Sequence, residues 1–176
     1  MRNVVHLNQK IARSAAAMML ATSLGCIAQT PPAEYGIKFE EPSTGTRIRG
    51  EAVRRSALPI NRTYEQLSPE ERAIVHGWYE GIAAGNEPPF PAEGTKAIHD
   101  AVRKGQAKLL VTGELFLVAT VEATGEVSTV KAVGSPSPLM TKFAASVLLL
   151  TKFKPAVCGG QKCRMDFPLY YSFRVE

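Results

Sequence analysis

The sequence has few of the residues that build catalytic or metal sites. Among its 176 residues are three histidines, three cysteines and one tryptophan. His76 and His99 fall on separate predicted helices, and neither has a Cys, Asp or Glu at ligand spacing on the same face, since Asp100 beside His99 points elsewhere on a helix. No Gly-rich loop precedes a helix in the pattern that cradles phosphate. These absences predict a protein that is not an enzyme and has no cofactor or metal site.

Net positive charge is also small once the N-terminal segment is set apart. The sequence has 21 Lys and Arg against 16 Asp and Glu, a formal charge of +5. Arg2, Lys10 and Arg13 fall within residues 1–28, which have no acidic residue, so the rest holds 18 basic and 16 acidic side chains. Nucleic-acid-binding proteins gather Lys and Arg on one face. Here these residues are spread along the chain, which argues against a nucleic-acid partner.

An uncharged run long enough to span a bilayer, about 20 residues, is missing as well. The run Ser14–Ala28 has 15 residues and follows the basic start of the chain. A charged start, an apolar middle and small residues at the end are the parts of a secretory signal. Residues 1–28 are therefore predicted to be a signal peptide, and the periplasm is the expected location.

Two ends of this signal are compatible with the sequence. The small residues of Cys26–Ala28 fit a cut before Gln29, which would release a soluble protein. Leu24–Cys26 resembles the end of a lipobox, which would lipidate Cys26 and tether the protein to a membrane. Ser23 stands where that motif normally has Leu, and the mismatch favours the soluble product. A membrane is expected as a partner only if Cys26 is lipidated or the signal stays uncleaved.

The other two cysteines, Cys158 and Cys163, flank a short Gly-containing segment. After export they would meet an oxidising compartment, where paired thiols form disulfides. Gly159 and Gly160 provide the backbone freedom of a tight turn. A redox motif usually has two intervening residues, and no further ligands for zinc lie nearby. We expect a structural disulfide between Cys158 and Cys163.

Residues 29–63 contain several Pro and Gly, scattered charge and no sustained period. This composition is typical of a linker or flexible arm. Tyr35, Ile37 and Phe39 alternate with other residues, which is compatible with a short strand that docks elsewhere.

Residues 64–108 are predicted to be a helical segment. Ser68-Pro69-Glu70-Glu71 forms a capping box with proline at the first helical position, so a helix should begin there and continue to about Ala84, with Ile74, Trp78 and Ile82 as its apolar stripe. A second helix is expected from Thr95 to about Ala107.

Residues 109–176 combine strands with one further helix. Alternating residues predict a hairpin of Leu115–Val121 and Val127–Val133. Helical spacing follows to Leu150, through Leu139, Phe143 and Val147. The final strand alternates Met165, Phe167, Leu169, Tyr171, Phe173 and Val175 with polar residues, so we expect one buried and one solvated face.

This order predicts an α+β fold, in which a helix packs on one face of a small antiparallel sheet. One or two helices and a poorly ordered N-terminal arm would precede it. Pro168 has no amide hydrogen for a central ladder, so the last strand is expected at an edge of the sheet.

Spaced Gly, Pro and apolar positions of residues 88–175 resemble the TonB C-terminal domain family. The positions that carry the resemblance are Phe90–Pro91, Gly125–Val127, Val130, Val133, Gly134–Ser135, Phe153–Ala156, Gly160 and Phe173. The resemblance implies a helix against a three-stranded antiparallel sheet. It also implies β-strand addition, in which a sheet edge pairs with a short peptide of a partner protein.

The strand that matches the family's binding edge supplies the candidate site residues. They are Arg164, Asp166, Phe167, Leu169, Tyr170, Tyr171 and Phe173. The chain differs from full-length energy transducers, because its leading segment looks cleavable and residues 29–63 are too short and too poor in Pro to bridge the periplasm. We therefore expect an exported protein-binding module of an envelope transport system, with a protein or peptide partner. The alternative is a structural envelope lipoprotein anchored at Cys26.

Overall fold

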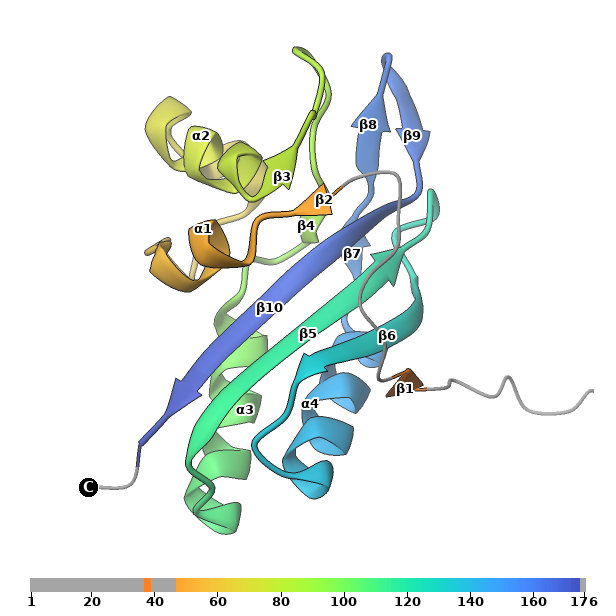
Figure 1. Cartoon of the computed structure of the whole chain (residues 1–176). Coiled ribbons are helices and arrows are strands. Elements are labelled where there is room, and N and C mark those ends of the chain that lie inside the picture. The colour runs from red at the N-terminus through yellow and green to blue at the C-terminus, as the bar shows by residue number, and fades with distance from the viewer. Residues whose placement is uncertain (1–36, 39–46, 175–176) are drawn as a thin grey trace, which may run out of the picture. The chain divides into compact units, whose positions relative to one another are not determined.

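The computed structural model describes residues 37–38 and 47–174 (Figure 1). The predicted signal peptide, with Cys26 and Gln29, lies outside these residues. The helices are α1 (Gly50–Arg55), α2 (Pro69–Gly77), α3 (Lys96–Leu109) and α4 (Pro138–Leu150), with a 3-10 turn at Tyr64–Gln66. None of these described helices is long and apolar enough to cross a membrane.

The strands form one central sheet and three small two-stranded pairings. The central sheet has the order β1-β6-β5-β10, from Ile37–Lys38, Val127–Gly134, Gly113–Val121 and Met165–Phe173. The pairings are β2 (Arg47–Ile48) with β3 (Tyr79–Glu80), β4 (Phe90–Pro91) with β7 (Phe153–Lys154), and β8 (Ala156–Cys158) with β9 (Gln161–Cys163). The α+β class is the one that the sequence predicts.

β6, β5 and β10 are antiparallel, and β1 is parallel to β6. β1 thus occupies the outer side of β6, where Ile37 pairs with Val130. Among the described residues, β10 pairs with no strand besides β5 and so lies at an edge of the central sheet. This is the position that Pro168 predicts.

Two helices, α3 and α4, pack side by side on one face of the central sheet (Figure 1). α3 buries Ile98 and Val102, and α4 buries Met140, Ala144 and Leu148. Facing them, the odd-numbered residues from Leu115 to Val121 on β5 and from Met165 to Leu169 on β10 are buried, as is Phe173, whereas Tyr171 is half-buried. The helix expected at Thr95–Ala107 is confirmed as α3.

The second face of β10 is not the solvated face that the sequence predicts. Asp166 is 3% exposed and Pro168 is buried, as are Val118 and Thr120 on the adjoining β5. Thr120 Oγ1 donates a hydrogen bond to Asp166 Oδ1 at 2.9 Å. Farther along, the guanidinium of Arg54 on α1 lies over the rings of Phe116 and Tyr170. Residues from the N-terminal side therefore cover part of this face.

Two helices differ from their predicted extent or buried face. α2 begins with the expected capping box, in which the Ser68 hydroxyl accepts from the Glu71 amide, but it ends at Gly77. Trp78 and Tyr79 are buried in the core just after the helix ends. Ile74 is 38% exposed, so the predicted stripe of Ile74, Trp78 and Ile82 is not a single buried helix face. In α4 the buried face is rotated by about one residue, which leaves Leu139 at 61% and Leu150 at 84% exposure.

The described residues, 37–38 and 47–174, all belong to one compact unit. The buried hydrophobic residues of the described chain lie between Val53 and Phe173, so this unit contains its own core. The helical segment of residues 64–108 belongs to it, because β4 pairs with β7 and the Glu87 and Val157 backbones exchange hydrogen bonds. Part of the predicted linker, residues 47–62, belongs to it as well.

The expected disulfide is present. Cys158 and Cys163 are bonded across the β8–β9 hairpin, with a Cα–Cα distance of 5.8 Å. Gly159 and Gly160, both with positive φ, make the turn between them. The bond therefore closes a local hairpin and links no distant elements.

Candidate functional site

The outer edge of β10 presents backbone groups that no described strand uses. The hydroxyl of Tyr79 donates to the carbonyl of Asp166 at 3.0 Å from outside the sheet. In a strand, the N–H and C=O of one residue point to the same side, and successive residues alternate. The backbone groups of Asp166, Pro168, Tyr170 and Ser172 therefore face outward, whereas those of the intervening residues face β5.

The first half of this edge is closed by the protein itself. The carbonyl of Asp166 is bonded to Tyr79, and Pro168 has no amide hydrogen to donate. The segment Ser56–Ile60 runs from α1 to the start of α3, where Thr95 Oγ1 lies 3.5 Å from the carbonyl of Ile60. This segment belongs to residues 29–63, the stretch predicted as a linker. Past Asp166, the outward groups that remain are the carbonyl of Pro168 and the N–H and carbonyl groups of Tyr170 and Ser172.

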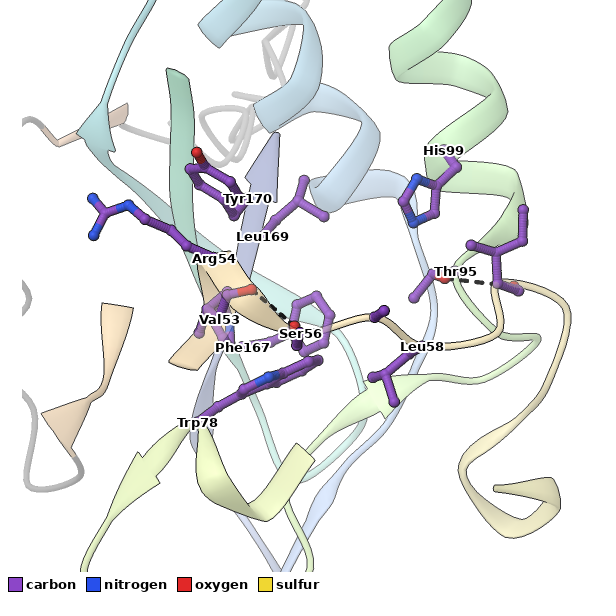
Figure 2. A pocket seen from close by; sticks show the side chains of 13 residues that line it. Val53, Arg54, Ser56, Leu58, Trp78, Thr95, His99, Phe167, Leu169 and Tyr170 are labelled. Atoms are coloured by element: carbon purple, nitrogen blue, oxygen red, sulfur yellow. Dashed lines mark hydrogen bonds between the residues drawn. The ribbon is translucent and has the colours of Figure 1, made fainter. Parts of the chain in front are cut away.

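A cavity of about 210 Å³ lies between the segment Ser56–Ile60 and the edge of β10. Figure 2 shows its two sides: Val53 and Arg54 come from α1, and Thr95 and His99 come from the first turns of α3. Residues 167–170 of β10 lie between these sides, and Trp78 closes one end. The cavity thus follows the edge of the strand.

A second cavity, of about 350 Å³, adjoins the first and shares Ile60 and His99 with it. It lies between α3 and the last residues of β10, Tyr171 and Phe173. Those two rings are stacked, with centroids 5.9 Å apart, and His99 packs edge-on against Tyr171 at 5.1 Å. We call the two adjoining cavities the edge groove.

Several buried polar atoms of the edge groove have no hydrogen-bond partner among the described residues. They are Trp78 Nε1 at the first cavity, and Gln106 Oε1 and Tyr171 Oη at the second. Asp166 Oδ2, on the same strand, is a further such atom. Burying a polar group without a partner costs about 1–3 kcal/mol, so native structures contain few of them. Three of these four atoms, Trp78 Nε1, Gln106 Oε1 and Tyr171 Oη, belong to residues that line the edge groove, which makes the groove the candidate site of this fold.

The two histidines of the described chain have different surroundings. Burial lowers the pKa of His99, against the opposing effect of the Asp100 carboxylate. His76 Nε2 lies 2.9 Å from the hydroxyl of Tyr64, and burial lowers the pKa of His76 and raises that of Tyr64 to about 12. His76 does not line the edge groove. His99 therefore joins the groove as a largely neutral ring near pH 7.

The predicted edge residues do not all reach the groove. Arg164 precedes β10 and lies 3.5 Å from the Glu122 carboxylate. Asp166 is buried against Thr120. The others on β10 divide between core and groove: Phe167 and Leu169 line the first cavity while mostly buried, Tyr170 also lines the first, and Tyr171 and Phe173 line the second.

Sequence reasoning missed the side of the groove opposite β10. His99 and Gln106 belong to a helix whose outer face showed only scattered polar residues. The segment Ser56–Ile60 lies within a stretch whose composition predicts a linker. Its apolar cluster, Ala57-Leu58-Pro59-Ile60, is the signal in the sequence that it docks on the core.

Among the described residues, no three His, Cys, Asp or Glu side chains are grouped closely enough to hold a metal ion. Comparison of the sequence with known protein families and with curated proteins finds no match.

Proposed function

We propose that this protein is an exported protein-binding module of the cell envelope. In this proposal an extended segment of the partner adds as a strand to the open half of β10 and lies along the edge groove. The observation that carries it is the coincidence of outward backbone groups at Tyr170 and Ser172 with buried polar atoms that lack partners in the adjoining cavities.

Backbone pairing would provide most of the affinity in this mode. Tyr170 and Ser172 each offer an N–H and a C=O on the outer side of the strand, and Pro168 offers a C=O alone. A partner strand would therefore pair over a short stretch from Tyr170 to Ser172. Pro168 and the segment Ser56–Ile60 would stop it from extending farther along β10.

Side chains of the partner would provide the specificity. An added strand continues the central sheet past β10, so every second side chain would face α3 and enter the second cavity. The stacked rings of Tyr171 and Phe173 offer an apolar floor there. Gln106 Oε1 and Tyr171 Oη are buried without partners behind this wall, and a small side-chain movement on binding would let them accept and donate hydrogen bonds. We thus expect a peptide with one apolar anchor and a polar neighbour.

Export to the envelope is supported by the sequence of residues 1–28 and by the oxidised pair Cys158–Cys163, which fits an oxidising compartment. The resemblance of residues 88–175 to TonB C-terminal domains supports an envelope transport system as the setting.

Ser172 allows a test that separates backbone pairing from side-chain contact. Ser172→Pro removes one outward N–H at an exposed position, in the same strand orientation that Pro168 already occupies. Ser172→Ala removes only the hydroxyl. A displayed library of short random peptides would be selected on the wild-type chain, and the enriched peptides would then be measured on both variants.

We expect Ser172→Pro to weaken the binding of the selected peptides by about tenfold or more, because one ladder hydrogen bond and the fit around it are lost. Ser172→Ala should leave their affinity unchanged. Amide exchange at Tyr170 and Ser172 should slow when the peptide is bound. Equal binding to all three proteins, with no protection of these amides, would show that the edge of β10 is not the binding site.

A further inference from the structure

The exposed side of the α3–α4 pair carries apolar and basic side chains together. Leu110 is 66% exposed, Leu139 is 61% and Phe143 is 37%. Lys104, Lys108 and Lys142 are exposed residues of the same two helices. We call these six residues the leucine–lysine patch. Large exposed apolar groups in contiguous arrangement usually mark a surface that meets another apolar phase.

Four of the six residues, Lys104, Lys108, Leu139 and Phe143, line one cavity between the two helices, and Leu110 and Lys142 are the chain neighbours of lining residues Leu109 and Phe143. A shallow cavity of about 230 Å³ joins Lys104, Lys108 and Leu109 of α3 to Leu139 and Phe143 of α4. Gly105 permits this approach, because a β-carbon there would lie 2.7 Å from the Phe143 ring. The end of α3 and the start of α4 therefore present one surface, and the edge groove lies elsewhere, along β10.

Leu110 holds a backbone conformation that favours glycine. It follows the last residue of α3 with φ 48° and ψ 39°, the left-handed region in which a β-carbon is strained. Glycine is the usual residue at this position of a helix end. Leucine gains little from packing here, because two-thirds of it is exposed. Strain without a packing benefit points to a role for this side chain outside the fold.

Charge is concentrated on the same two helices. α3 and α4 together contain five basic side chains (Lys96, Arg103, Lys104, Lys108 and Lys142) and one acidic side chain, Asp100. Asp100 is engaged by Lys96 and Arg103. Within the described part of the chain, no carboxylate lies at ion-pair distance from the three lysines of the patch. The occupant of the patch should therefore be anionic.

We propose that the leucine–lysine patch docks on an anionic lipid surface. Leu110 and Leu139 would enter the boundary between headgroups and acyl chains, and the three lysines would meet lipid phosphates while their stems lie along the apolar zone. The cavity between the helices offers no polar side chain besides the lysines, so it lacks the directed hydrogen bonds that orient a protein partner. A second copy of the chain is disfavoured, because it would bring two basic surfaces together.

The test uses the chain from Gln29, which contains every described residue of the compact unit and excludes the apolar run before it. It would be sedimented with vesicles of phosphatidylcholine alone and of phosphatidylcholine with an equal part of phosphatidylglycerol. We expect binding to the second kind only, and its loss as salt screens the lysines. Failure to bind phosphatidylglycerol vesicles at low salt would overturn the proposal, even if an acidic amphipathic peptide bound instead.

Matched variants locate the contact. Leu139→Gln should weaken vesicle binding about tenfold, as expected for a leucine that leaves an apolar phase. Leu150→Gln makes the same change at the other end of α4, at a residue that is 84% exposed and outside the patch, and should have no effect. Equal losses in these two variants would overturn the assignment of the patch.

Leu110→Gly separates lipid binding from folding. Glycine relieves the left-handed strain, so the unfolding midpoint should stay or rise while vesicle binding falls about tenfold. Lys104→Gln combined with Lys108→Gln should weaken binding by about tenfold or more and reduce its salt dependence. A Leu110→Gly chain that binds vesicles as the wild type does would show that the strained leucine has no part in docking.

Discussion

Gly125→Ala is the substitution whose cost can be worked out most directly from the structure. Gly125 lies in the turn between β5 and β6 with φ +86°, and its carbonyl accepts from the amide of Phe153 at 2.9 Å. A β-carbon at this position would lie 2.2 Å from the carbonyl oxygen of Phe153. The turn and β7 are therefore in backbone contact, which a side chain of any size would break.

The expected cost has two parts. A β-carbon in the left-handed region costs about 1–2 kcal/mol, offset by about 0.4–1 kcal/mol because alanine restricts the unfolded chain. The overlap with the Phe153 carbonyl must be relieved by moving β7, whose Phe153 packs against Phe167 at 5.1 Å, and such overpacking costs about 1–3 kcal/mol. We expect a loss of about 3 kcal/mol in all.

Urea unfolding of the oxidised protein measures this loss, and Gly85→Ala is the matched control. Gly85 has φ +84°, and a β-carbon there would meet nothing within 4 Å. That variant should lose about 1 kcal/mol, from backbone strain alone. If both variants lose the same free energy with an unchanged denaturant slope, the close approach of the turn to β7 is refuted.

Three further predictions concern pH, the disulfide and the N-terminus. Burial lowers the pKa of His99. The contribution of the neutral ring to stability is therefore complete above the unfolded pKa of about 6.5 and is lost as pH falls below that value. The thermal midpoint of His99→Gln should depend less on pH between neutral and acid than that of the wild type. Replacing Cys158 and Cys163 by serine should cost about 2 kcal/mol in urea unfolding and leave the fold intact, because the closed loop is short. The mass of the mature protein should correspond to a start at Gln29, and an acylated Cys26 would support the lipoprotein alternative instead.

The β5–β6 hairpin and the edge position of β10 could be predicted from the sequence because each carries its own signal. The parallel pairing of β1 with β6 could not, and it makes the central sheet four-stranded where the resemblance implies three antiparallel strands. Alternation defined β5 and β6, and the turn residues between them fixed the hairpin. Pro168 alone was enough to place β10 at an edge, since a proline cannot complete a central ladder. These signals depend only on neighbouring residues, so they predict the same local structure whatever the rest of the chain packs against.

What the sequence did not predict depends on contacts between distant residues. The solvated face assigned to β10 was wrong because Tyr79, far along the chain, bonds to the backbone of Asp166 and helps to cover it. The apolar residues on both faces of β5, among them Phe116 and Val118, were the available sign that both faces are covered. No single local signal predicts the edge groove, because its walls come from β10, from the segment Ser56–Ile60 and from α1 and α3, which are distant in the sequence.

The two proposed surfaces both include residues of α3, but they lie on different flanks of this helix. His99, Arg103 and Gln106 line the cavity beside β10, whereas Lys104 and Lys108 line the cavity beside α4. Successive residues of one helix thus point to opposite flanks, so a peptide on the sheet edge and a lipid surface under the helix pair would not compete for space. Substitutions at sites without shared contacts act nearly independently. Ser172→Pro should therefore leave vesicle binding unchanged and Leu139→Gln should leave peptide binding unchanged, and a loss of both functions in either variant would mean that the two surfaces are coupled through α3.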